Sequence, residues 1–325
     1  MKAIIPVAGV GTRLRPFTYT LPKVLLNVAG KPILGHILDA LQSHSIDEAT
    51  IIVGYMGDLV EEYVRKHHDL KVNFIYQEER LGLGHSIWIA RENIKGDDPL
   101  LIILGDTIFD VDLSLAMNSG FSTLGVKSVE DPRRFGVVEL EKGFISRLIE
   151  KPEQPTSNLA LVGLYFINNP SLLVSCLDEL IDKNIRTRDE YQLTDALQMM
   201  IDKGEKFTTF PVDGWYDCGK PETLLSTNRY LLDGMSAPKT MDGTVIIPPA
   251  FISSTAHVER SVIGPYATVA AGAKVVDSVI KDSIISDGAT VTASMLEQSI
   301  IGNNAIVKGK FSRLNVGDSS EIDRS

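Results

Sequence analysis

The sequence predicts an α/β protein in which a Rossmann-like mixed sheet is followed by a short left-handed parallel β-helix. Three features lead to this prediction. Strand and helix patterns alternate over residues 2–120, strands follow one another over 121–168, and aliphatic residues recur at six-residue intervals after residue 243. We expect one domain over residues 1–233, a linker over 234–243, and the β-helix with a polar tail over 244–325.

Apolar runs of strand length alternate with helical patterns in the first 120 residues. The expected strands are 2–7, 49–53, 72–76 and 100–104, and the expected helices are 33–44, 59–67 and 84–94. Alternating β and α units predict a parallel sheet with helices on both faces. Ligands bind such sheets at the carboxyl ends of the strands.

The pattern changes after residue 120. Strands are expected at 121–129, 136–140, 144–149 and 161–167, with turns between them, so we predict an antiparallel or mixed extension that forms the far wall of a cleft. The domain is completed by expected helices at 170–181, 191–203 and 222–232 and by a strand at 206–212.

The last third of the chain carries a repeat. Its glycines are interspersed among aliphatic residues six positions apart, namely Ile252 and Val258; Ile263, Val269 and Val275; Ile285 and Val291; Ile301 and Val307. A period of six with small aliphatic residues indicates a β-helix of triangular section, with one inward side chain per face. A piece of an ordinary β-sandwich is the alternative.

Composition and charge limit the class of function. The chain has 325 residues, 44% hydrophobic and 23% charged, which suffices for a large core. A formal net charge of −10 argues against a general nucleic-acid-binding protein, whereas local cations can still bind a nucleotide.

Cys176 and Cys218 are too few for a disulfide framework, and the apolar run 3–10 is too short to span a membrane. We therefore expect a cytoplasmic protein that binds neither nucleic acid nor membranes.

A glycine-bearing turn follows the first expected strand. Gly9 and Gly11 would let backbone amides approach a phosphate, although neither the P-loop nor the dinucleotide fingerprint is present. Arg13 and Lys23, ten residues apart, could bracket a triphosphate. A plain tight turn and two solvated cations are the alternative, but their coincidence favours phosphate binding.

Two later segments also carry chemistry. Gln77 offers both a donor and an acceptor, which suits one edge of a pyrimidine, although the following Gly82-Leu83-Gly84 also fits a helix N-terminus. Asp106 follows a buried strand at the expected carboxyl edge of the sheet, where an acid suits a hard cation such as Mg²⁺. A helix cap is the alternative for Asp106.

The motif Gly11-Thr12-Arg13, followed by Pro22-Lys23, resembles the opening of the sugar-1-phosphate nucleotidyltransferases, a family that includes glucose-1-phosphate thymidylyltransferases and uridylyltransferases. The resemblance covers residues 1 to about 233, and the turn is one glycine shorter than in most members. Further matches follow in the family's order at Phe135-Gly136-Val137, Glu150-Lys151-Pro152, Val162-Gly163-Leu164-Tyr165 and Trp215-Tyr216-Asp217-Cys218-Gly219.

The resemblance implies a role for each matching residue. Arg13 and Lys23 would be the catalytic cations, and Asp106 and Asp217 would hold Mg²⁺. The nucleotide would be bound by Ala8, Gly9, Gly11, Thr12, Gln77 and Gly82. The sugar phosphate would be bound by Gly136, Glu150, Lys151, Val162 and Gly163.

The implied reaction is attack of a sugar 1-phosphate on the α-phosphorus of a nucleoside triphosphate, with release of pyrophosphate. We expect dTTP or UTP and glucose 1-phosphate as substrates, and a homo-oligomer assembled or regulated through the β-helix. Three alternatives stay open: a mannose-1-phosphate guanylyltransferase, an additional acyltransferase activity in the β-helix, and an inactive regulatory subunit. The short β-helix with its single histidine, His257, argues against the second, and the complete set of cations and acids argues against the third.

Overall fold

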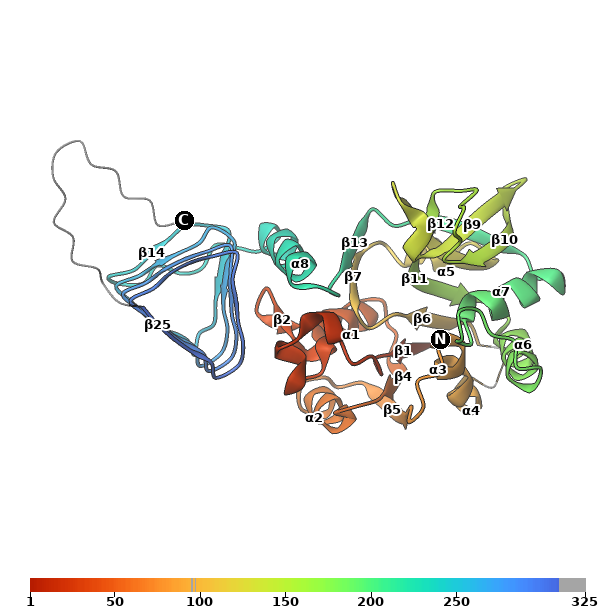
Figure 1. Ribbon diagram of the computed structural model, residues 1–325, viewed down its shortest axis with the longest axis horizontal. Coiled ribbons are helices and arrows are strands. Elements are labelled where there is room, and N and C mark those ends of the chain that lie inside the picture. Colours follow the sequence, from red (N-terminus) through yellow and green to blue (C-terminus); the bar gives the residue numbers. More distant parts are fainter. Residues whose placement is uncertain (95, 97, 310–325) are drawn as a thin grey trace. The chain divides into compact units, whose positions relative to one another are not determined.

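The computed structural model describes residues 1–94, 96 and 98–309, which form two compact units (Figure 1). The first unit comprises Met1–Leu26 and Lys31–Thr227. The second comprises Asn27–Gly30 together with the described chain from Asn228 to residue 309. The expected polar tail, residues 310–325, lies outside the described residues.

The first unit is built on four parallel strands in the order β5-β4-β1-β6. The strands span Lys2–Pro6 (β1), Glu48–Val53 (β4), Lys71–Tyr76 (β5) and Leu100–Ile103 (β6). Ile4 and Ile102 pack in one core cluster, while the next residue along β1, Ile5, is also fully buried. Because successive side chains of a strand point to opposite faces, this sheet is covered on both faces, as its continuous apolar strands predict.

The sheet continues on one side with antiparallel strands, which confirms the predicted mixed extension. β11 pairs antiparallel with β6, β8 and β9, and β12 adds to β8 in parallel. The extension comprises β8 (Ser122–Ser128), β9 (Gly136–Glu141), β10 (Phe144–Glu150), β11 (Leu159–Ile167) and β12 (Phe207–Pro211).

The predicted helices of this unit are present close to their expected positions, α2 begins two residues earlier than expected, and the short helix α5 was not predicted. The expected helix 84–94 is broken at Ala90, whose N–H closes a tighter turn on Ile87 O. The expected helix 191–203 begins two residues later, because Gln192 is extended, Tyr191 N donates to Leu81 O, and Tyr191 O accepts from Gly84 N. The helices are α1 (Ile33–Ser43), α2 (Gly57–His67), α3 (Leu83–Ile89), α4 (Arg91–Ile94), α5 (Ser114–Met117), α6 (Pro170–Asp182), α7 (Leu193–Asp202) and α8 (Pro221–Asp233).

Two short strand pairs were not anticipated. β7 (Thr107–Asp110) and β13 (Gly214–Asp217) form an antiparallel pair in which Thr107 lies opposite Asp217. β2 (Asn27–Val28) and β3 (Lys31–Pro32) form a small hairpin. Strands of two to four residues leave no recognisable period in a sequence, so only the fold reveals them.

The second unit contains a triangular prism of three sheets, each with four parallel strands (Figure 1). Its stacked sheets are consistent with a left-handed β-helix and exclude a β-sandwich. The strands are β14 (Val245–Ile246), β17 (Val262–Ile263), β20 (Val279–Lys281) and β23 (Met295–Glu297); β15 (Ala250–Ile252), β18 (Ala267–Val269), β21 (Ile284–Ile285) and β24 (Ile300–Ile301); β16 (His257–Glu259), β19 (Lys274–Val276), β22 (Thr290–Thr292) and β25 (Ile306–Lys308).

The aliphatic residues predicted to point inward do form the prism core. Val258 stacks on Val275, and Val275 on Val291. The sheet that contains β17 contributes a column of which the six-residue period included only the first member: Ile263 stacks on Ile280, and Ile280 on Leu296. The step into this column is five residues instead of six, from Val275 to Ile280 and from Val291 to Leu296, which is why Ile280 and Leu296 fell out of step with the repeat.

Candidate active site

The glycine turn after β1 is shaped by its neighbours. Gly11 has φ +66, and a Cβ there would lie 2.9 Å from Lys23 Cβ. The Gly11 carbonyl accepts a hydrogen bond of 2.9 Å from Thr18 Oγ1. A side chain at position 11 would therefore be strained and would push Lys23 away, so the glycine is required by the close approach of Lys23.

Lys23 is a buried cation rather than a surface one. Its side chain is 9% exposed, and its Nζ donates to Asp106 Oδ2 at 2.7 Å. Burial alone would raise the pKa of Asp106. The charge of Lys23, its hydrogen bond and the hydrogen bond from the Thr107 hydroxyl have the opposite effect, and together they lower this pKa below its usual value. Asp106 is therefore held as a carboxylate.

The antiparallel pair β7–β13 brings Asp217 close to Asp106. It lies opposite Thr107, the residue after Asp106, and Cys218 N donates to Asp106 O at 3.1 Å. In the described part of the chain, no group of three or more His, Cys, Asp or Glu side chains is arranged to hold a metal ion. Two neighbouring carboxylates nevertheless fit Mg²⁺, which proteins commonly hold with one or two carboxylates, waters and substrate phosphates.

A first pocket, of about 480 Å³, opens at the carboxyl ends of the parallel strands. Gln77 is 8% exposed within it, and its Nε2 lies 3.2 Å from His85 Nδ1 and 3.4 Å from Gly82 O, so the amide is held in place. The pocket lining includes these predicted residues: Ala8, Gly9, Gly11, Thr12, Arg13, Lys23, Gln77 and Asp106.

A second pocket, of about 530 Å³, lies against the antiparallel extension. Glu150 accepts a 2.7 Å hydrogen bond from Thr194 Oγ1 and lies 3.0 Å from Lys151 Nζ. A Cβ at Gly136 would lie 2.8 Å from Leu161 and 3.3 Å from Glu150 Oε2, so the glycine leaves room for both. The predicted residues that line this pocket are Arg13, Asp106, Gly136, Glu150, Lys151, Val162 and Asp217.

Two predicted site residues line neither pocket. Gly82 has φ +109, and a Cβ there would lie 2.5 Å from Tyr191 O. Gly163 has φ +91 and sits where the pairing of β11 with β8 shifts, with its carbonyl bonded to Leu104 N. Both glycines therefore permit the backbone paths beside the pockets instead of facing into them.

The two pockets meet. Arg13 and Asp106 line both, as do Leu83, Leu104 and Glu190. A ligand in one pocket would thus share a cation and a carboxylate with a ligand in the other. This arrangement suits a reaction between two phosphate-bearing molecules.

Sequence reasoning missed several side chains of the second pocket. Arg134, Trp215 and Lys220 line it, and the Trp215 ring packs against Phe135 with centroids 4.9 Å apart. Glu190 also lines it. Trp215 begins a matched motif, and Arg134 and Lys220 directly flank one, so those motifs and their flanks were the available signal. Glu190 begins the segment 190–195, which also matches the family, but no role was assigned to it.

Cys218 is adjacent to this site but is not a reactive group. It is fully buried, and burial raises the pKa of its thiol to about 12. The thiol therefore stays protonated at neutral pH.

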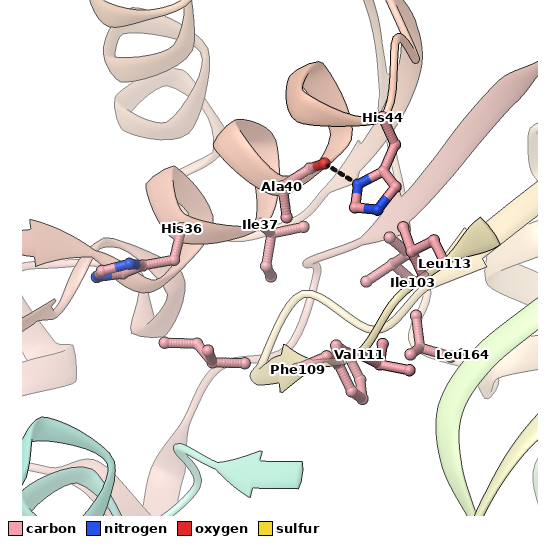
Figure 2. A pocket seen from close by; sticks show the side chains of 10 residues that line it. His36, Ile37, Ala40, His44, Ile103, Phe109, Val111, Leu113 and Leu164 are labelled. Atoms are coloured by element: carbon pink, nitrogen blue, oxygen red, sulfur yellow. Dashed lines mark hydrogen bonds between the residues drawn. The ribbon is translucent and has the colours of Figure 1, made fainter. Parts of the chain in front are cut away.

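A third, smaller pocket of about 40 Å³ lies between α1 and β7 (Figure 2). Its lining is apolar apart from His36 and His44, and His44 Nδ1 lies 2.9 Å from Ala40 O. It shares no lining residue with the two larger pockets and offers no charge for a triphosphate.

No helix within residues 1–94, 96 and 98–309 combines the length and apolar character that crossing a membrane requires.

Comparison with known proteins agrees with this geometry. Residues 2–234 match the family model described as nucleotidyl transferase. The chain is 32% identical to a glucose-1-phosphate thymidylyltransferase of Streptomyces griseus, over 88% of this chain and 87% of that protein. It is 34% identical to the low-salt glycan biosynthesis nucleotidyltransferase Agl11 of Haloferax volcanii, over 75% of this chain and 69% of that protein.

Two further similarities bear on the site. The chain is 35% identical to the bifunctional protein GlmU of Methanococcus vannielii over 76% of its own length, but it spans only 61% of that protein. A solved structure of UDP-glucose pyrophosphorylase complexed with UDP-glucose superposes with a TM-score of 0.60 at 25% identity, covering 72% of this chain and 99% of that one.

Proposed function

Because the chain belongs to the nucleotidyl transferase family, we propose that it transfers a nucleotidyl group from a nucleoside triphosphate to a sugar 1-phosphate and releases pyrophosphate. One observation carries this proposal: a glycine-lined pocket and a pocket with Glu150 and Lys151 share Arg13 and Asp106. A transfer between two phosphates needs the two substrates to meet at such a junction.

We propose dTTP or UTP as the nucleotide and glucose 1-phosphate as the sugar phosphate. Gln77 supports a pyrimidine, because it lines the first pocket and a side-chain amide can both donate to and accept from one edge of such a base. Similarity to a glucose-1-phosphate thymidylyltransferase and to a UDP-glucose pyrophosphorylase supports the same pair of substrate classes.

The protein's own side chains would do three things in this reaction. Arg13 would stabilise the charge that develops toward pyrophosphate, and Lys23 and Lys151 would hold the attacking phosphate against repulsion by the triphosphate. Glu150, fixed by Thr194, would accept hydrogen bonds from sugar hydroxyls. Asp106 and Asp217 would hold Mg²⁺, which when bound supplies charge neutralisation between the two phosphates.

The test is pyrophosphate release with Mg²⁺, in which dTTP, UTP, GTP, CTP and ATP are crossed with glucose, mannose and N-acetylglucosamine 1-phosphates. We expect turnover with a pyrimidine triphosphate and glucose 1-phosphate. Turnover with only GTP and mannose 1-phosphate would support the proposed type of reaction, but it would overturn the proposal that Gln77 binds a pyrimidine. Absence of turnover with every pair would overturn the proposal.

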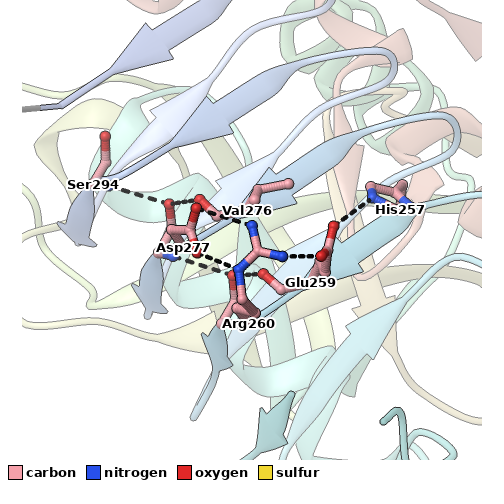
Figure 3. A network of polar contacts seen from close by, with 8 residues as sticks. His257, Glu259, Arg260, Val276, Asp277 and Ser294 are labelled. Carbon is pink, nitrogen blue, oxygen red and sulfur yellow. Dashed lines mark hydrogen bonds and ion pairs between the residues drawn. The ribbon is translucent and has the colours of Figure 1, made fainter. Parts of the chain in front are cut away.

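A second activity in the prism is the competing candidate, since a GlmU relative is named bifunctional. His257 is the histidine that a CoA-dependent acyl transfer could use as a base. Its side chain is 60% exposed, its Nε2 lies 3.4 Å from Glu259, and Glu259 is in turn paired with Arg260 in a surface network (Figure 3). Thiol release from acetyl-CoA in the presence of a sugar 1-phosphate would reveal such an activity, and we expect none.

A further inference from the structure

The side-chain amide of Gln77 lines the first pocket directly after β5. The residue is 8% exposed, and its backbone N donates to Val53 O at 2.8 Å, so it has little freedom to move. A side-chain amide carries an acceptor oxygen on one side and two N–H donors on the other. Which side faces a ligand therefore depends on which side the protein holds.

Two acceptors of the protein hold the nitrogen of this amide. Gln77 Nε2 lies 3.4 Å from Gly82 O and 3.2 Å from His85 Nδ1. A backbone carbonyl only accepts, so an amide turned the other way would place two oxygens against each other at Gly82. Nδ1 of His85 then accepts the second N–H, which requires the tautomer with its proton on Nε2. Both donors of Gln77 are used within the protein, and its Oε1 is left for a ligand.

The ring of His85 is held between two aromatic neighbours. Its centroid lies 5.8 Å from that of Trp88, and it stacks on Tyr191 at 6.4 Å. Tyr191 is in turn fixed by its backbone, because its N–H donates to Leu81 O. His85 lines neither of the two large pockets, so it acts on a ligand only through Gln77.

The surroundings of His85 keep its ring neutral. Partial burial is the largest effect and lowers the pKa of His85; the charge of Glu79 opposes this shift, and the charge of Arg186 adds to it. The net result is a pKa below the usual value. At pH 7 the ring therefore has one bare nitrogen, as the contact with Gln77 requires.

We infer that His85 is a positioning residue that fixes the Gln77 amide with its carbonyl toward the first pocket, and that this selects uracil or thymine against cytosine. The inference rests on the proposed function. Uracil and thymine carry an N–H at N3 beside an oxygen at C4, whereas cytosine carries a bare N3 beside an amino group. An amide that can turn over pairs with either pattern. A fixed Oε1 accepts from the N–H of uracil or thymine and opposes the bare N3 of cytosine.

The kinetic test compares kcat/KM for UTP and CTP, or for dTTP and dCTP, at a fixed concentration of sugar phosphate. His85→Phe keeps an aromatic ring but removes the acceptor, whereas His85→Asn loses the ring but keeps an acceptor oxygen near the place of Nδ1. The preference for the uracil or thymine nucleotide should fall about tenfold or more in His85→Phe, and stay within about threefold of the parent in His85→Asn.

The two variants serve as controls for each other. If the ring mattered only for packing, His85→Phe would keep the preference and His85→Asn would lose it, and the inference would be wrong. Equal losses of kcat/KM for both nucleotides would also overturn it, because they would indicate a general structural effect. The KM for the sugar phosphate should stay unchanged in both variants, since His85 does not line the second pocket.

Nitrogen NMR of the histidine rings provides a readout that needs no substrate. At pH 7 the signals that disappear in His85→Asn should show a proton on Nε2 and a bare Nδ1. The side-chain N–H protons of Gln77, identified by their loss in Gln77→Glu, should exchange with water at least about tenfold faster in His85→Phe than in the parent. A proton on Nδ1 would overturn the inference. A bare Nδ1 and slow exchange in a chain that shows no turnover would refute the proposed function and still support the hold on Gln77.

Discussion

Lys23 and Asp106 are 83 positions apart in the sequence, and Lys23 Nζ donates to Asp106 Oδ2 at 2.7 Å. The pair joins a cation proposed to bind phosphate with a carboxylate proposed to bind Mg²⁺, at the junction of the two pockets. Each partner neutralises the other before substrates arrive, so neither charge is buried alone. The site is thus assembled in the protein itself.

The first prediction concerns Arg13. Arg13→Ala should lower kcat by about a hundredfold or more, because a donor aimed at developing charge is lost, while the melting temperature stays unchanged. Arg15→Ala is the control: Arg15 is exposed, stacks on Tyr19, and lines neither large pocket. Steady-state pyrophosphate release measures both, and near-normal turnover of Arg13→Ala would refute its assignment.

The second prediction concerns the sugar side. Glu150→Gln and Lys151→Met should each raise KM for the sugar phosphate by about tenfold, since a lost charged hydrogen bond costs about 1.5–3 kcal/mol, with the nucleotide KM little changed. Lys142→Met is the control, because Lys142 is 88% exposed near the start of the same strand. If only the KM for the nucleotide rose, the assignment of Glu150 and Lys151 to the sugar phosphate would be wrong.

The third prediction concerns the two thiols. Burial raises the pKa of Cys176 and brings that of Cys218 to about 12, so burial disfavours the thiolate form of both. A chromogenic disulfide reagent should find no reactive thiol in the native protein and both thiols after unfolding in guanidinium. Cys218→Ala should retain turnover. A thiol that reacts within seconds in the native state would contradict the burial.

The fourth prediction concerns the prism core. Ile280 is fully buried between Ile263 and Leu296, so Ile280→Ala should destabilise the prism by about 2–5 kcal/mol through the cavity it leaves. Val279→Ala, its partly exposed neighbour, should cost less than about 1 kcal/mol. Urea unfolding monitored by circular dichroism compares the two, and equal losses would mean that Ile280 does not point inward.

The fifth prediction concerns acid stability. Hydrogen bonds from Lys183 and Lys203, each 2.6 Å long, lower the pKa of Glu179 to about 2. A depressed carboxyl pKa stabilises the fold above the unfolded pKa of about 4.3, and this contribution disappears as pH falls through the folded pKa. The stability difference between the parent and Glu179→Gln should therefore be constant above about pH 5 and vanish near pH 2.

The matched control for this titration is Glu141→Gln. Glu141 is 70% exposed and lies 3.7 Å from Lys142, so its removal should leave the stability curve unchanged at every pH. Urea midpoints measured from pH 7 downward give both differences. A Glu179→Gln difference that grows as the pH falls would have the wrong sign for this assignment.

Local pattern predicted most elements and failed where distant contacts decide. Residues 191 and 192 continue the helical pattern of α7, but Tyr191 pairs with Leu81 and Gly84, and these bonds delay the helix until Leu193. Likewise Ile280 belongs to the prism core although it does not fit the period of six. The turn that precedes it is one residue shorter than this period requires. In both cases a partner far along the chain outweighs the local preference.

The sequence by itself determined the alternation of strands and helices, the repeat of the prism, and the kinds of chemical group available at Arg13, Lys23, Gln77, Asp106, Glu150, Lys151 and Asp217. Periodicity and residue chemistry are local properties, so they can be read without coordinates. Only the tertiary structure decided which groups meet. The unanticipated β7–β13 pair brings Asp217 beside Asp106, and the fold buries Lys23 against the same carboxylate. The physical reason is that pairing across a hundred residues depends on how all the intervening elements pack, and no single segment encodes it.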